Sequence, residues 1–454
     1  MKTAAGAVLS LSAISANAGI IIPAGDWTLD INGNVNAFAN YTHAKATTAG
    51  TGAGGEDGYT DEFGGFVGRS AGEYGHHNAT EEVYSGFQYN SARVVTGGMA
   101  SEGTTGRYGN KQIGINTGLL PSWLGFTGTT RQNDVDVSFT MSMQPNVSDN
   151  GATGDVNAPL FRQAFLTFGD KSWGSIKLGK DIGIFASDAI LNDMTLLGVG
   201  GGAGVSGAPT TFGGIGTGYI YAAWKGQVAY TTPNFNGFQA TVGITNPNQV
   251  ASASGNQDRF GFEAKASYDM KQDGFSGKVW VSGATYDVSN AAGSHTVSVG
   301  DIGAHVDAGA FGVTGYYYGG KGAGTTVLGG EGTATTYNYQ EVQAANGSTS
   351  IVQTSSGSTA KRSSDGGYVQ LTYATPIKTK IGVAYGISNL DLASTETAAL
   401  NNTVKSNERW TVGLYHPLTK HLNLVAEYNN IQSEAHDGAK AESDTYSAGA
   451  ILFF

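Results

Sequence analysis

The chain has 454 residues, of which 70 are Gly and none is Cys, and its formal net charge is −11. The absence of Cys excludes a disulfide framework and a thiolate metal site, and the acidic balance argues against a nucleic-acid partner. Only 13% of the residues are charged, against a usual share of roughly a quarter, and no apolar run reaches the length of about eighteen residues that a membrane-spanning helix needs.

The first residues have the pattern of an export signal. Lys2 precedes an apolar-to-small run from Ala4 to Ala16, and the sequence Ala16-Asn17-Ala18 fits a signal-peptidase site. We therefore expect residues 1–18 to be a signal peptide that is removed after Ala18, and residues 19–454 to form one domain. A buried N-terminal helix is the alternative reading of this run.

The first predicted strand, residues 26–41, separates apolar from polar side chains by position. Trp27, Leu29 and Ile31 share one face, whereas Asn32 and Asn34 share the other. Successive side chains of a strand point to opposite faces, and a row of Asn amides needs more hydrogen-bond partners than an apolar core supplies. We expect one face to meet lipid and the other to meet water inside a barrel.

The same alternation recurs along the rest of the chain. A polar stretch at 42–111 is interpreted as a long loop that could carry its own hairpin near 84–95, and two further long loops are expected at 182–218 and 320–364. The remaining predicted strands cover residues 112–128 with a bulge at Pro121, 134–144, 160–169, 172–181, 219–232, 237–245, 259–270, 275–287, 296–307, 310–319, 365–374, 378–389, 407–416, 421–433 and 443–454.

Short turns and long loops alternate after the first strand, so both termini fall at the short-turn end. This asymmetry predicts an all-β fold, a transmembrane antiparallel β-barrel of sixteen strands with short periplasmic turns and long outer loops. A barrel of that size leaves an aqueous channel. The C-terminal strand alone would equally fit a soluble sandwich.

Several stretches resemble the general porins of Gram-negative bacteria. They are residues 162–169 (RQAFLTFG), 173–180 (WGSIKLGK), 230–238 (YTTPNFNGF), 412–420 (VGLYHPLTK) and the terminal Phe454. The resemblance implies a homotrimer of sixteen-stranded barrels that passes small hydrophilic solutes, with the third loop folded into the lumen and Phe454 as an assembly signal. Trp123 and Thr127 stand where the family often has cations, and the first loop is longer than usual.

The third loop, 182–218, is expected to hold the constriction. Its apolar residues could fix it against the barrel wall, and its glycines allow a tight return. Candidate pore-lining charges are acids in or beside this loop, cations on the facing wall, and two inward acids of the third strand: Asp181, Asp188, Asp193, Arg162, Lys177, Asp134 and Asp136. The alternatives are an exposed surface loop for the acids and side chains that reach the membrane interface for the cations.

Enzyme chemistry has little support in the sequence. There is no His-x-x-x-His helix, nucleophile elbow or P-loop, and we expect no cofactor and no metal. The predicted function is passive diffusion of small hydrophilic solutes and ions through the outer membrane, with a mild cation preference and with membrane lipid and lipopolysaccharide as surroundings. A substrate-specific channel of eighteen strands, which needs a hairpin inside 60–111, and an outer-membrane barrel enzyme are the alternatives.

Overall fold

The computed structural model describes residues 19–44, 59–60, 66–67, 82–84, 87–89, 111–145, 147, 160–202, 210–247, 259–290, 293–329, 332–343, 349–396, 403–436, 438 and 440–454. The expected signal peptide and most of the expected first loop lie outside these residues. Two small hairpins are described within that loop, β3 (Tyr59–Thr60) with β4 (Phe66–Val67) and β5 (Glu82–Tyr84) with β6 (Phe87–Tyr89).

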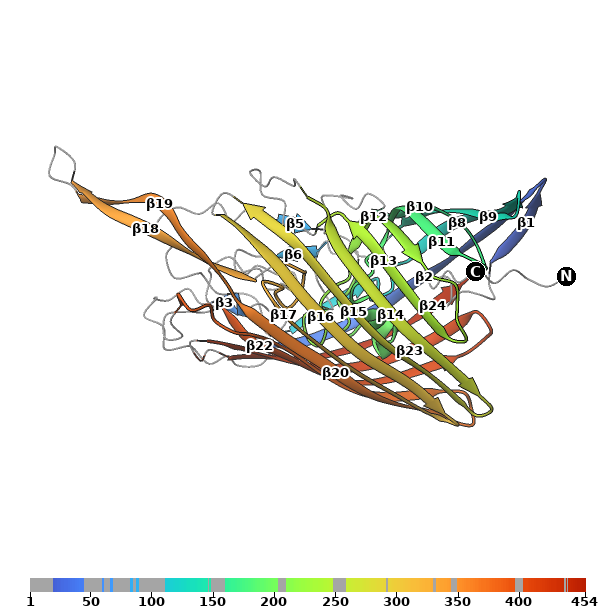
Figure 1. The fold of residues 1–454 in the computed structure, drawn as a ribbon. Coiled ribbons are helices and arrows are strands. Elements are labelled where there is room, and N and C mark those ends of the chain that lie inside the picture. Colours follow the sequence, from blue (N-terminus) through green and yellow to red (C-terminus); the bar gives the residue numbers. More distant parts are fainter. Residues whose placement is uncertain are drawn as a thin grey trace.

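One antiparallel sheet closes into a barrel of sixteen strands, which confirms the predicted fold and rejects the eighteen-stranded alternative (Figure 1). The barrel closes because β2 pairs on one side with β24 and on the other with β7 and β8, which together make one interrupted strand. The strands are β2 (Trp27–Ala44), β7 (Lys111–Asn116), β8 (Trp123–Gln132), β9 (Val135–Gln144), β10 (Leu160–Asp170), β11 (Gly174–Ile182), β12 (Trp224–Thr231), β13 (Phe238–Thr245), β14 (Gly261–Gln272), β15 (Phe275–Asn290), β16 (Gly293–Ala308), β17 (Phe311–Lys321), β20 (Ser363–Ala374), β21 (Lys380–Leu390), β22 (Val404–Pro417), β23 (Leu422–Ala435) and β24 (Lys440–Phe453).

A short strand and a long hairpin outside the barrel were also not expected from the sequence. A short strand, β1 (Ile20–Ala24), pairs with the start of β2. The expected loop at 320–364 contains a long hairpin, β18 (Thr333–Gln343) with β19 (Thr349–Lys361), which projects from the barrel at the end opposite the C-terminus (Figure 1). Its polar Ser- and Thr-rich sequence lacks the apolar alternation by which the barrel strands were recognised.

The row of Asn side chains on β2 does point inward, but water is not what satisfies the central ones. Asn34 and Asn36 are 0% and 2% exposed. Their amides donate to the main-chain oxygens of Pro121 and Leu120, each at 2.9 Å. The segment between β7 and β8, where a bulge at Pro121 was predicted, therefore folds against the inner wall and supplies the partners that buried amides require.

The loop after β11 crosses the lumen, as predicted. Residues 183–202 and 210–223, here called the inward segment, include the helix α1 (Ser187–Leu191) and the 3₁₀ helix η2 (Met194–Leu197). All of these residues are buried except Leu191, Asn192 and Leu197. In the described part of the chain, no helix is long and apolar enough to cross a membrane.

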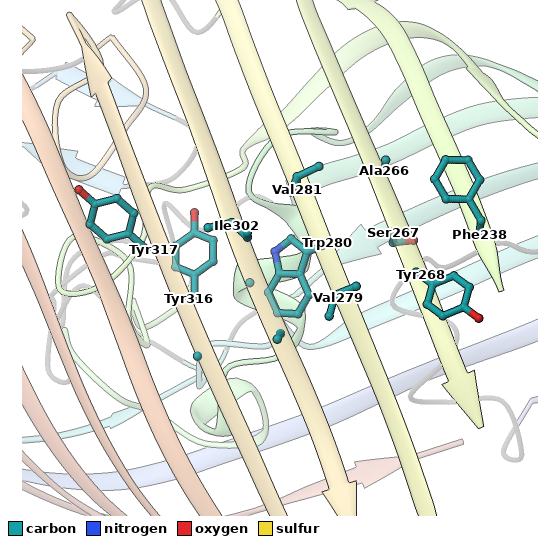
Figure 2. Close-up of a pocket in the computed structure, with 13 residues that line it drawn as sticks. Phe238, Ala266, Ser267, Tyr268, Val279, Trp280, Val281, Ile302, Tyr316 and Tyr317 are labelled. Atoms are coloured by element: carbon teal, nitrogen blue, oxygen red, sulfur yellow. The ribbon is translucent and has the colours of Figure 1, made fainter. Parts of the chain in front are cut away.

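A hollow of about 550 Å³ lies in the wall formed by β13 to β17 (Figure 2). Its lining includes side chains that point away from the lumen, such as Tyr268, Val281 and Tyr317, and these are 42%, 48% and 55% exposed. Small residues leave the wall thin here, and the ring of Trp280 fills the space beside Gly303. The hollow opens on the apolar outer surface and is not part of the lumen.

Candidate functional site

The inward segment is attached first to β14. Glu263 is fully buried, and its Oε2 accepts hydrogen bonds from the main-chain N–H groups of Ile184 and Phe185 at 2.8 and 2.9 Å. Its other oxygen contacts Lys225 Nζ at 2.7 Å. A buried carboxylate is stable only when its charge and its lone pairs are both matched, and here one lysine and two N–H groups do this.

The second attachment is an ion triad between α1 and the wall. Asp188, which is 3% exposed, pairs with Lys265 of β14 at 3.0 Å and also with Lys278 of β15. Lys265 lies opposite Ser282 and Lys278 opposite Asp269 on these neighbouring strands, and both lysines reach Asp188, which reduces the repulsion between them. The triad keeps one formal positive charge.

Asp193 organises the middle of the inward segment. One oxygen accepts from the main-chain N–H of Thr195 at 2.9 Å and so begins η2. The other accepts from Gly214 N at 3.0 Å and from the Tyr219 hydroxyl at 2.8 Å, and lies 3.7 Å from Arg409 of β22. Asp193 therefore holds the outgoing and returning halves of the segment together and joins both to the wall.

Close approach of these two halves requires glycine. Gly200 has φ +60°, and a Cβ placed on it would lie 2.4 Å from the Cα of Gly213. Main-chain hydrogen bonds join the halves at this point, with Gly201 N donating to Gly213 O at 2.8 Å. Only glycine combines a positive φ with this contact at no steric cost.

The far end of the segment is attached to β23. Glu427, 4% exposed, accepts from the N–H groups of Val199 and Gly200 at 3.0 and 2.8 Å, and from the Tyr415 hydroxyl at 2.7 Å. The inward segment thus spans the lumen from β14 to β23.

Aromatic side chains form the wall between these attachments. Trp280 of β15, Tyr316 and Tyr318 of β17 and Tyr368 of β20 point inward and are at most 6% exposed. The rings of Tyr368 and Tyr219 lie 5.8 Å apart edge to face, a favourable geometry for aromatic pairs. The Tyr368 hydroxyl also donates to Ala189 O at 2.8 Å. This wall gives the inward segment an apolar surface to pack on.

The structure places the predicted site residues in three locations. Asp188 and Asp193 lie in the inward segment. Asp181 is buried on β11, pairs with Lys177 and accepts from Gln163 at 3.0 Å, while Arg162 is buried on β10. Asp134 and Asp136 lie at the turn between β8 and β9, at the short-turn end, where Asp136 pairs with Arg131 at 2.8 Å. That turn is at the short-turn end of the barrel, whereas the wall residues that anchor the inward segment, such as Glu263, Lys265 and Glu427, lie within strands.

Sequence reasoning missed the residues that anchor the segment. Glu427, Arg409, Lys278 and Gln370 were not selected, although Gln370 Oε1 accepts from Met194 N at 2.9 Å. The strand period could have shown that such a side chain faces the lumen, because Glu427 alternates with Leu424 and other outward side chains. Parity identifies a lumen-facing charge, but it does not show which loop residue meets it.

A closed β-barrel with a chain segment packed across its lumen is the architecture of an outer-membrane channel. A sequence model of the Gram-negative porins matches residues 4–436, and the chain belongs to that family. Channels of this family serve passive diffusion across the outer membrane.

Solved structures show the same fold at low sequence identity. The outer-membrane channel DcaP of Acinetobacter baumannii matches with a TM-score of 0.60 and 14% identity, over 96% of this chain and all of that one. An anion-selective porin from Comamonas acidovorans matches with a TM-score of 0.55 and 12% identity, over 94% of this chain and all of that one. OmpF of Salmonella typhi in complex with daunomycin matches with a TM-score of 0.51 and 13% identity, over 96% of this chain and all of that one. No curated protein gives a significant sequence match.

Proposed function

We propose that this porin passes small hydrophilic solutes and ions with only a mild preference for cations. The supporting observation is the balance of charge around the inward segment. Among the described residues that hold or border the inward segment are six carboxylates and six basic side chains: Asp181, Asp188, Asp193, Glu263, Asp301 and Glu427, with Arg162, Lys177, Lys225, Lys265, Lys278 and Arg409. A balanced set of charges produces little net electric field in the lumen. The net charge of the whole chain, −11, therefore determines whether the channel prefers cations or anions.

Reconstitution into a planar bilayer tests this proposal. The reversal potential in a salt gradient should show a cation-to-anion permeability ratio slightly above one at low salt. This ratio should approach one as the salt concentration rises, because the screening length falls to about 10 Å at 0.1 M and is shorter still at higher salt. An anion-selective channel would contradict the proposal.

We further propose that the chain assembles as a homotrimer surrounded by outer-membrane lipid and lipopolysaccharide. The support is the family and a solved form of OmpT of Vibrio cholerae, described as a trimer, whose fold matches with a TM-score of 0.50 and 12% identity. Light scattering of the protein extracted in mild detergent should give three times the mass of one chain. A monomeric mass in the same detergent would contradict this assembly.

Export by a cleaved signal is the third part of the proposal. β1 begins at Ile20, two residues after the expected cleavage following Ala18, so residues 19–454 would contain the whole barrel domain. The intact mass of the protein from outer membranes should correspond to a chain that begins at Gly19. We propose no catalytic activity, since a channel function accounts for the inward charges without one.

A further inference from the structure

Arg162 is a buried cation with no counter-charge among the residues that the structure describes. Arg162 is 5% exposed, and its Nη2 atom is buried without a hydrogen-bond partner. Among the described residues, the other buried cations have carboxylate partners, as Lys225 does with Glu263 and Arg409 with Asp193. Arg162 instead lies against Trp224, with its Cζ 6.0 Å from the ring centroid.

The fold directs this guanidinium inward by a bulge. The pairing of β10 with β9 shifts register between Leu160 and Gln163, and such shifts re-aim side chains. Phe161 is turned outward and is 66% exposed, while Arg162 is turned inward. The Gln144 side chain fixes the bulge by accepting from Arg162 N at 3.0 Å.

The guanidinium borders a small, partly open cavity of about 30 Å³. The barrel wall contributes Arg162, Trp224 and the β7–β8 connection at Leu119, and the inward segment contributes Ile190 and Leu196 among others. One water molecule needs about 10–15 Å³ on this measure, so the cavity has room for about two or three groups of that size. It is too small for sulfate or an organic acid.

An arginine in such a place keeps its charge, because its guanidinium does not lose a proton in proteins. An isolated ion buried in apolar surroundings is strongly unfavourable, and the remaining lining offers mainly aliphatic and aromatic groups. We propose that this cavity binds one halide-sized monovalent anion, which pairs with Arg162 at the contact between the barrel wall and the inward segment. Binding there stabilises the inward segment in its packed position.

Crystallography with bromide tests the site directly. Crystals of the full-length mature protein grown in sodium bromide should show an anomalous difference peak beside the Arg162 guanidinium, in the cavity next to Trp224. A map without that peak, in crystals that diffract well enough to show bromide elsewhere, would overturn the proposal.

Thermal unfolding provides a second measurement. At equal ionic strength, sodium chloride should raise the unfolding midpoint above that in sodium gluconate, whose anion is too large for the cavity. Arg162→Met should abolish this difference. Arg131→Met is the matched control, because Arg131 is exposed and has carboxylate partners at 2.8 and 2.9 Å, and it should keep the difference. An equal chloride effect in wild type and Arg162→Met would also overturn the proposal, and if that variant fails to fold, the bromide map decides.

Discussion

Removing Glu427 should release the far end of the inward segment and widen the channel. The substitution is Glu427→Ala on β23. It removes the acceptor of the N–H groups of Val199 and Gly200 and of the Tyr415 hydroxyl. The rest of the barrel keeps its main-chain pairing, so the effect is local to the segment.

The magnitude follows from the hydrogen bonds that are lost. Each buried N–H left without a partner costs about 1–3 kcal/mol, so the two together cost about 2–6 kcal/mol. A change of about 1.4 kcal/mol is tenfold in population, and the lower bound therefore raises the detached state about 30-fold. Water that enters after the truncation can satisfy part of this loss, which makes the lower bound the appropriate expectation.

Single-channel recording in planar bilayers measures the result. Glu427→Ala should show a larger mean conductance, or added fluctuations to a higher level, relative to wild type. Glu434→Ala is the matched control, because Glu434 lies on the same strand but pairs with Lys405 and Lys440 at 2.8 and 2.9 Å. If the two variants conduct alike, and both show the heat-dependent gel shift of folded barrels, the reasoning about this anchor is refuted.

Three further perturbations test other parts of the structure. Asp188→Asn leaves its two lysine partners without a counter-charge, and the reversal potential should move toward anions, most at low salt; no shift would show that the triad is remote from the ion path. Deleting Phe454, whose N–H and C=O both bond to β2 at 3.0 and 2.9 Å, should lower the yield of folded barrel in outer membranes, and a normal yield would contradict the assembly role. Gly303→Ala puts a Cβ 2.1 Å from the Trp280 ring and should lower stability by about 1–3 kcal/mol in urea unfolding, whereas Gly315→Ala, with nothing within 4 Å, should not; equal midpoints would contradict the packing argument.

The barrel was predictable because its strands are amphipathic with a strict period of two. Val35 is 52% exposed and its neighbours Asn34 and Asn36 are buried, as alternation predicts for a wall with two different surroundings. The short turns also indicated that the consecutive strands they join pair with each other. The expected strand at 219–232 begins only at Trp224, because residues 219–223 are apolar on both faces and pack inside the lumen.

Single side chains were less predictable wherever the period is broken. Arg162 is among the predicted pore-lining cations, and strict alternation along this strand would place Phe161 and Phe165 on the opposite, outward face, yet Phe165 is buried on the inner side. The bulge between Leu160 and Gln163 turns Arg162 inward as well. Alternation therefore predicts the correct inward orientation of Arg162 for the wrong reason. The bulge causes this orientation, and a bulge has no clear signature in one sequence.

The partners of the inward acids were the least predictable feature, for a geometric reason. Asp188 meets Lys265 and Lys278, which are 77 and 90 residues away in the chain, and Asp193 meets Arg409 across the lumen. Local pattern fixes the face on which each charge lies but not its height along the barrel, which depends on the stagger of all the intervening strands.

The pairing of the inward acids also explains why an acidic chain need not form a strongly cation-selective channel. Charges that would attract ions if unpaired are instead used to hold the segment in place, so selectivity and the position of the segment depend on the same carboxylates. A substitution that frees one of these carboxylates or its partner should therefore alter both properties together.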